Sequence, residues 1–158
     1  MSDIAAKPAN FPWATVTYLV AAVLSIFAWI LYPLPWFGSP FADILFAAGF
    51  LVMIGVVLID VSAIRTMTRA KTTIWPHQGA SHLVTSGPFS FSRHPIYLAN
   101  TMAMFGLGLI GGIAWFFIFG LIAAFITQKL AVEPEERHME AKFGKKYRDY
   151  AKRVRRWI

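Results

Sequence analysis

The sequence lacks cysteine, and it has few charged residues for its length. The absence of cysteine excludes disulfides, thiolate metal sites and cysteine nucleophiles. Charged residues make up only 15% of the 158 residues, whereas hydrophobic residues make up 57%, which is too apolar for an ordinary soluble domain. Three stretches, residues 8–42, 44–59 and 94–128, have no Asp, Glu, Lys or Arg. Membrane spans have this character, because a hydrocarbon core of about 30 Å requires about 20 apolar residues.

Several motifs of common enzyme classes are also missing. The chain has no glycine-rich phosphate loop or dinucleotide fingerprint and no Gly-x-Ser-x-Gly nucleophile elbow. His77 and His82 lie in a polar segment without the helical His-x-x-x-His or Glu-x-x-His spacing of a metal site. We therefore expect no bound metal, and we expect any chemistry to use other side chains.

The apolar stretches predict an all-α integral membrane protein with about four transmembrane helices. The first two spans cover roughly residues 13–32 and 41–64, separated by a proline-rich loop that cannot continue a helix. The third apolar block, residues 96–131, has an expected turn at Gly111-Gly112 and so forms a helical hairpin. Its first limb, residues 97–110, is only about 21 Å long. Either the turn does not reach the far side of the membrane, or the limb begins below the headgroups, with the polar residues before it slightly inside the membrane boundary.

Lysine and arginine are distributed unevenly. The net charge is +7, and ten Lys and Arg residues fall between residues 129 and 156. The polar segment 65–93 has four, whereas the loop 32–40 and the Gly111-Gly112 turn have none. The positive-inside rule then places both termini in the cytoplasm, and we expect the membrane to be a bacterial inner membrane. A basic segment beside a membrane indicates contact with anionic lipids. Nucleic acid is the weaker alternative, because the spans already account for the charge bias.

Two polar clusters flank the hairpin. Arg93, His94 and Tyr97 fall at the start of the third span, where backbone N–H groups attract carboxylates and phosphates. Glu135 and Glu136 follow the last span. Adjacent residues point about 100° apart on a helix, so we expect at most one glutamate to face a central site. The structural alternatives are an interfacial anchor for the first cluster and helix-dipole partners for the second.

Two further features carry weaker signals. Asp60 lies late in the second span, where an acidic residue is a functional candidate by default, although a partner such as Arg65 or Arg93 explains it equally well. From Glu133 onward, apolar residues recur at three- and four-residue spacing. This pattern predicts a cytosolic amphipathic C-terminal helix, which Gly144 weakens in its middle.

The two clusters together resemble a known family. The segment LVTSGPFSFSRHPIYLAN, an apolar hairpin, and then EERHMEAKFGKKYRDYAKRVRRWI are similar to the isoprenylcysteine carboxyl methyltransferases, which share an integral-membrane superfamily with the phospholipid methyltransferases. The similarity covers roughly residues 72–158. It implies that S-adenosylmethionine binds at the cytosolic face without a Rossmann domain. Residues 1–158 then form one methyltransferase domain, with two spans in residues 1–64 and the cofactor-binding core in residues 65–158.

The resemblance also implies the residues of the site. The cofactor contacts fall at eight positions: His82, Leu83, Val84, Phe89, His94, Pro95, Tyr97 and Glu135. Glu136 is the neighbour that shares or exchanges the role of Glu135. The resemblance does not define a catalytic residue, and the candidates are His94, Arg93 and Glu136.

One position departs from the family pattern. The eukaryotic isoprenylcysteine enzymes have an arginine just before the glutamates that is implicated in holding the substrate carboxylate, and this chain has Ala131 there. The expected acceptor is an isoprenylcysteine-type carboxylate or a related small lipid. Methylation of a phospholipid amine or of a thiol is the alternative within the superfamily. Outside it, the alternatives are a non-catalytic membrane anchor with a basic lipid-binding tail and a transporter assembled from several copies around Asp60.

Overall fold

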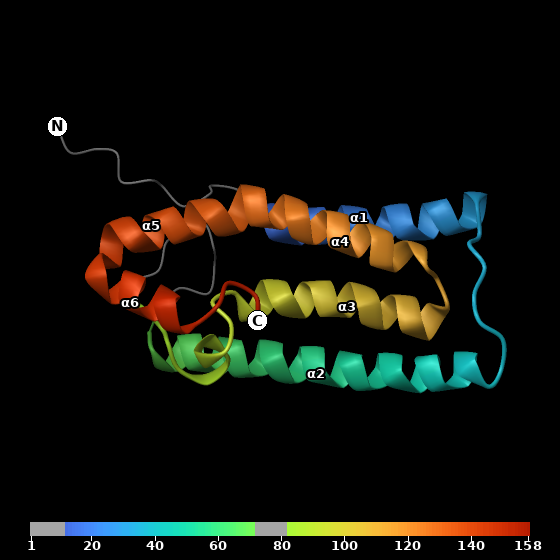
Figure 1. The fold of residues 1–158 in the computed structure, drawn as a ribbon, viewed down its shortest axis with the longest axis horizontal. Coiled ribbons are helices and arrows are strands. Elements are labelled where there is room, and N and C mark those ends of the chain that lie inside the picture. The colour runs from blue at the N-terminus through green and yellow to red at the C-terminus, as the bar shows by residue number, and fades with distance from the viewer. Residues whose placement is uncertain (1–11, 72–81) are drawn as a thin grey trace.

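The computed structural model describes residues 12–71 and 82–158, and every regular element in those residues is helical. The longer helices are α1 (Trp13–Leu31), α2 (Phe41–Arg69), α3 (Pro95–Gly111), α4 (Trp115–Thr127), α5 (Glu133–Phe143) and α6 (Lys145–Arg153). Two short elements connect them, the 3-10 turn η2 (Gly87–Ser90) before α3 and the π-helical turn η3 (Gln128–Val132) between α4 and α5. Figure 1 shows α1 to α4 running along one elongated bundle, with α5 and α6 at one end.

The lengths and composition of the helices confirm an all-α membrane architecture. Three stretches are long and apolar enough to cross a membrane, namely Trp13–Leu31, Phe41–Arg69 and the continuous Trp115–Phe143. The helix α3 is apolar but shorter, and its 17 residues extend about 25 Å. Large apolar side chains such as Leu31 and Leu51 are 67% and 70% exposed. Lipid tails are the fitting surroundings for such faces.

Three boundaries differ from the sequence prediction. The helix α2 continues to Arg69, because arginine is a good helix former whose long side chain reaches water from the membrane edge. The predicted single tail helix is two helices, because Gly144 takes a φ of +52° and ends α5. The helix α5 starts at Glu133, as the sequence predicts, but η3 joins it to α4 without a break. The π-helical turn η3 precedes Pro134 and is the kind of irregularity that accommodates a proline within a helix.

The hairpin turn confirms the prediction from the two glycines. The helix α3 ends at Gly111, and Gly112 has a φ of +64°, which glycine adopts without strain. The Trp36 ring lies against this turn, since a Cβ added at Gly112 would be 3.1 Å from Trp36 Cδ1. The helices α2 and α3 also approach closely, because a Cβ at Gly49 would be 3.0 Å from the Gly106 carbonyl oxygen. Small residues allow such close packing between membrane helices.

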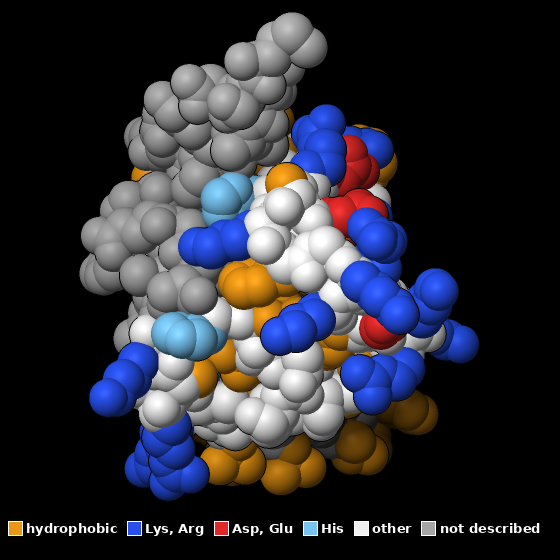
Figure 2. Space-filling model, turned by 90° about the vertical axis from the view of Figure 1, so that its left-hand side faces the viewer, with side chains coloured by type: hydrophobic (Ala, Val, Ile, Leu, Met, Phe, Trp, Pro, Cys, Tyr) orange, Lys and Arg blue, Asp and Glu red, His pale blue; other side chains and the backbone are white. Residues whose placement is uncertain are grey.

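Basic side chains gather at the end of the bundle formed by α5 and α6 (Figure 2). The exposed basic residues from α5 onward are Arg137, Lys142, Lys145, Lys146, Arg148, Lys152, Arg153 and Arg155. The loop between α1 and α2 lies at the opposite end of the bundle (Figure 1) and contains no charged residue. The bundle therefore has one strongly basic end, whereas the opposite end has an uncharged loop followed by the acidic Asp43 in the first turn of α2.

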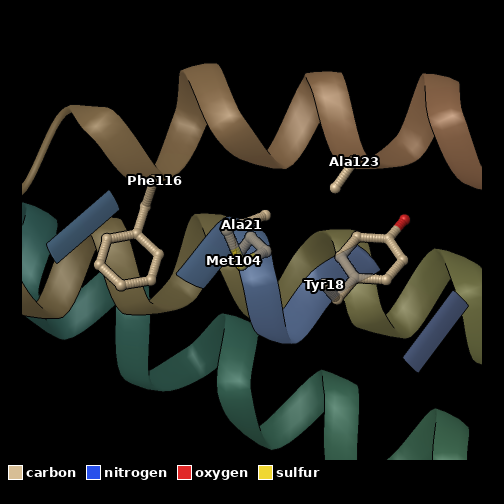
Figure 3. Close-up of a cluster of buried hydrophobic side chains, with 5 residues drawn as sticks. All are labelled: Tyr18, Ala21, Met104, Phe116 and Ala123. Atoms are coloured by element: carbon tan, nitrogen blue, oxygen red, sulfur yellow. The ribbon is translucent and has the colours of Figure 1, made fainter. Parts of the chain in front are cut away.

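Apolar packing joins the helices that carry the two polar clusters. Where α1, α3 and α4 meet, Figure 3 shows a buried group made of Tyr18, Ala21, Met104, Phe116 and Ala123. The Tyr18 hydroxyl lies 2.5 Å from the Thr101 hydroxyl, so its polar atom is satisfied inside the bundle. Towards the basic end, a second buried group consists of Ala14, Tyr97, Ala131 and Val132. This packing holds the start of α3 against η3.

Candidate functional site

The first polar cluster lies at the start of α3. Pro95 is the first helical residue, a position that suits its fixed φ and missing N–H. The backbone N–H of His94 donates to Ser92 Oγ at 3.2 Å, and the backbone N–H of Arg93 donates to the Arg155 carbonyl at 3.1 Å. Local bonds and a distant segment of the chain therefore both hold this loop in place.

The two polar clusters meet in the fold. The Tyr97 hydroxyl donates to Glu135 Oε1 at 2.5 Å, and His94 Nδ1 lies 3.6 Å from Glu135 Oε2. His94 Nε2 lies 3.3 Å from Glu136 Oε1, and the imidazole stacks on the Tyr97 ring with centroids 5.7 Å apart. Both glutamates thus contact one imidazole. They contact different nitrogens of the ring, and the expectation that at most one glutamate faces a central site stays a prediction.

Glu136 has two arginine partners. Arg93 Nη1 lies 3.2 Å from Glu136 Oε1, and Arg156 donates from Nε and Nη2 to Glu136 Oε2 at 3.1 and 2.7 Å. The Glu136 side chain is only 11% exposed, so these charge-assisted bonds are strong ones. The hydrogen bond to Glu136 also raises the pKa of Arg156. The sequence does not single out Arg156, which is one of many basic residues in the tail.

Glu135 has other partners than Glu136. Within residues 12–71 and 82–158, its hydrogen-bond and ion-pair partners are the Tyr97 hydroxyl and the His94 imidazole, and no lysine or arginine pairs with it. Its side chain is 19% exposed. A carboxylate that is largely buried is normally paired with a cation. Glu135 is therefore a candidate for contact with a cationic ligand.

Two tyrosines of α6 support the first cluster. The Tyr147 hydroxyl accepts a hydrogen bond from Arg93 Nη1 at 3.4 Å, and the Tyr150 hydroxyl donates to the Phe89 carbonyl at 2.6 Å. Burial raises the pKa of Tyr147 to about 12 and also raises the pKa of Tyr150. Leu83 packs against the buried group formed by Tyr147, Tyr150 and Val154. The helix α6 thus connects the segment around Leu83 to the residues around Arg93.

The other predicted cofactor contacts are His82, Leu83, Val84, Phe89 and Pro95. Val84 and Phe89 are half-buried, and Pro95 is buried. His82 and Leu83 line an open cleft of about 490 Å³, whose other lining residues are Thr85, Phe143, Lys146, Asp149, Tyr150 and Arg153. The structure therefore brings His94, Tyr97 and Glu135 into direct contact, whereas the segment 82–84 and Phe89 are linked to α6.

Asp60 is separate from this cluster. It lies in α2, and among the described residues it forms no ion pair, while its Oδ1 atom has no hydrogen-bond partner there. Of its expected partners, Arg93 pairs with Glu136 instead. The part of the chain that the structure describes also contains no group of three His, Cys, Asp or Glu side chains placed to hold a metal. His77 lies outside the described residues.

Ala131 provides no polar group to the site. It is 3% exposed and packs with Tyr97 in the buried group near the basic end. Lys129, two residues earlier, pairs with Glu133 at 2.7 Å. In the eukaryotic enzymes of the resembling family, an arginine at this position is implicated in holding the substrate carboxylate. The described residues provide no positively charged side chain there.

Parts of the chain are similar to known proteins. A 76-residue stretch is 36% identical to the nickel-cobalt-cadmium resistance protein NccN of Alcaligenes xylosoxydans xylosoxydans, which corresponds to 48% of this chain. The chain spans about a third of that relative's length, 35%. No solved structure matches the chain.

The family model of the phospholipid methyltransferases matches residues 44–146, which include α3, the hairpin and both glutamates. Because this match covers well over half of the chain, the protein belongs to the phospholipid methyltransferase family of membrane methyltransferases, within the superfamily expected from its motifs.

Proposed function

We propose that this protein transfers a methyl group from S-adenosylmethionine to a lipophilic acceptor at the cytosolic face of a bacterial inner membrane. The observation that carries the proposal is the pairing of Glu135. This largely buried carboxylate has no lysine or arginine partner within the described residues, whereas its neighbour Glu136 has two arginines. A ligand that brings its own cation would complete the pairing of Glu135. S-Adenosylmethionine has two cations, an ammonium and a sulfonium.

The residues around Glu135 fit such a donor. Each carboxylate oxygen has about two lone-pair sites, so the bonds from Tyr97 and His94 leave acceptor capacity for an ammonium or for ribose hydroxyls. The rings of Tyr97 and Phe89 are suited to stacking on adenine or facing the sulfonium. The backbone at residues 82–84 belongs to no helix, so its N–H and C=O groups are suited to the adenine edge.

Methyl transfer depends more on the alignment of donor and acceptor and on the exclusion of water than on acid–base groups. Bound S-adenosylmethionine supplies an activated methyl group on its sulfur. The protein residues hold the donor and the acceptor in line, which can remove several kcal/mol of the barrier, and the buried group around Tyr97 and Ala131 limits access of water. Of the catalytic candidates, Arg93 and Glu136 pair with each other at 3.2 Å. His94 also contacts both glutamates, but a neutral imidazole has one donor and one acceptor nitrogen, so His94 is the candidate suited to hold or move a proton.

The proposed acceptor enters from the membrane. The outer faces of α1 and α2 carry exposed apolar side chains along their length, and the site lies at the basic end, which the positive-inside rule places in the cytoplasm together with both termini. A carboxylate of an isoprenylcysteine-type or related small lipid is our first choice, and a lipid amine or a thiol is the alternative. The similarity to a metal-resistance protein does not decide between them. We propose that residues 1–158 act as one domain, in which residues 65–158 bind the donor.

The test is methyl transfer to membrane lipids. Purified protein in detergent is incubated with a bacterial lipid extract and S-adenosylmethionine with a radiolabelled methyl group, and the lipids are separated. We expect label in a lipid fraction with the wild type and strong loss with Glu135→Gln. The matched control Glu133→Gln, whose side chain pairs with Lys129 outside the site, should give wild-type labelling. Equal labelling by all three proteins, or none by a folded wild type, would count against the proposal.

A further inference from the structure

The segment after α6 lies across the site. Residues 154–158 follow the end of α6 at Arg153 in a non-helical conformation. The carbonyl of Arg155 accepts a hydrogen bond from the backbone N–H of Arg93 at 3.1 Å. The Trp157 indole N–H donates to Gln128 Oε1 at 3.0 Å. The segment is therefore anchored both to the loop before α3, which carries Arg93 and His94, and to η3, which directly precedes α5 and its two glutamates.

The guanidinium of Arg156 occupies a defined place within this segment. Its Nε and Nη2 atoms both donate to Glu136 Oε2, at 3.1 and 2.7 Å. The other oxygen, Glu136 Oε1, faces Arg93 Nη1 at 3.2 Å and His94 Nε2 at 3.3 Å. The Glu136 carboxylate is thus held from both sides, with Arg156 on one oxygen and Arg93 and His94 on the other.

This arrangement separates the roles of the two glutamates. His94 lies between them, 3.6 Å from Glu135 and 3.3 Å from Glu136. If Glu136 lost Arg156, its Oε2 atom would have no cationic partner among the described residues, and its carboxylate would compete with Glu135 for a cationic ligand. The bonds from Arg156 prevent this competition, because they compensate the Glu136 charge on the side away from His94.

We propose that Arg156 is a positioning residue for the donor site: it holds Glu136 against Arg93 and His94, so that Glu135 is the carboxylate that meets the cation of the donor. This inference rests on the proposed function, because it assumes that a cationic donor binds at Glu135. It assigns a role to a residue outside both sequence clusters. It also implies that the segment 154–158 acts through one side chain and not only through its backbone bonds.

Arg155 provides a matched control. It is the neighbouring arginine with the same charge, and its side chain is exposed. Its contact with the site is the backbone carbonyl that accepts from Arg93, and this bond remains when the side chain is removed. Arg155→Ala therefore removes a positive charge from the same segment without removing a partner of Glu136.

The experiment is calorimetric titration of S-adenosylhomocysteine, the demethylated donor, into detergent-purified full-length variants. For Arg156→Ala we expect the Kd to rise about tenfold, which corresponds to about 1.4 kcal/mol, and for Arg155→Ala we expect a Kd within about twofold of the wild type. If Arg156→Ala does not fold, Arg156→Gln keeps an unbranched polar side chain without the positive charge and should give the same loss. An unchanged Kd for the folded Arg156 variant would overturn the inference.

A double-mutant cycle distinguishes positioning from a general structural role. If Arg156 acts through Glu136, then Arg156→Ala should cause little further loss of affinity in a Glu136→Gln background. Losses that simply add would show that Arg156 acts by another route, and the inference would then fail while the proposed function stands. A folded wild type that does not bind S-adenosylhomocysteine would instead refute the proposed function, and this inference with it.

Discussion

The close approach of α2 and α3 gives a sharp prediction about stability. A Cβ added at Gly49 of α2 would lie 2.7 Å from Ile110 Cγ1, 2.9 Å from Leu109 Cβ and 3.0 Å from the Gly106 carbonyl oxygen. The last two atoms are fixed by the backbone of α3 and cannot rotate away. We therefore expect Gly49→Ala to push the two helices apart and to destabilise the protein.

The magnitude follows from a comparison with Gly55 on the same helix. A Cβ at Gly55 would meet only the flexible end of Met102, at 3.9 Å. Both substitutions gain the same helix propensity, up to about 1 kcal/mol, so this term cancels between them. Overpacking costs about 1–3 kcal/mol, and this is the expected difference in the free energy of unfolding. For a chain of this size, each kcal/mol shifts the melting temperature by about 2–4 °C.

The assay is thermal unfolding of the wild type, Gly49→Ala and Gly55→Ala in one detergent, followed by circular dichroism. Gly55→Ala should melt at or above the wild-type temperature, and Gly49→Ala should melt several degrees below Gly55→Ala. If the two variants melt together, the helices do not approach as closely as described, and the position of α3, on which His94 depends, would need revision.

Three other predictions concern the site and its surroundings. Tyr97→Phe removes the hydroxyl that donates to Glu135, so the Kd for S-adenosylhomocysteine should rise about three- to tenfold; an unchanged Kd in calorimetry would separate this bond from donor binding. Gly112→Ala places a Cβ on a residue with a φ of +64° and beside Trp36, so the melting temperature should fall, by an amount that reflects about 1–2 kcal/mol of backbone strain; a wild-type melting temperature would contradict this turn. Burial raises the pKa of Tyr147 to about 12 in the folded protein, against about 10 when unfolded. The unfolded chain therefore loses this proton first, and stability should decline as the pH rises from about 10 towards 12. Tyr147→Phe should weaken that decline in thermal melts at pH 9, 10 and 11, and an identical decline in the variant would contradict the burial of this hydroxyl.

Features that depend on long, regular patterns could be predicted from the sequence. Uncharged stretches located the spans, since charge cannot be placed in lipid cheaply, and the glycine pair located the hairpin turn at Gly112. The start of α3 followed from Pro95, which suits the first helical position. The family followed from the two motifs, and the family model confirms it.

Features that depend on tertiary contacts could not be predicted. Arg156 lies in a non-helical segment among many basic residues, and only the fold shows that it reaches Glu136. The sequence did not predict that Glu135 and Glu136 both contact His94. Adjacent helical residues point in different directions, but an imidazole has two nitrogens and can contact both side chains. The π-helical turn before Pro134 has no sequence pattern comparable to the hydrophobic period of a helix.

The most direct test of the account is calorimetric titration of S-adenosylmethionine into the folded wild type and into Glu135→Gln. We predict saturable binding by the wild type and a loss of about tenfold or more with Glu135→Gln, because the charged partner contributes about 1.5–3 kcal/mol. The Glu133→Gln control should bind as the wild type does. Absence of saturable heat from the folded wild type, or equal affinity of Glu135→Gln, would contradict the claim that Glu135 and His94 together hold a cationic methyl donor.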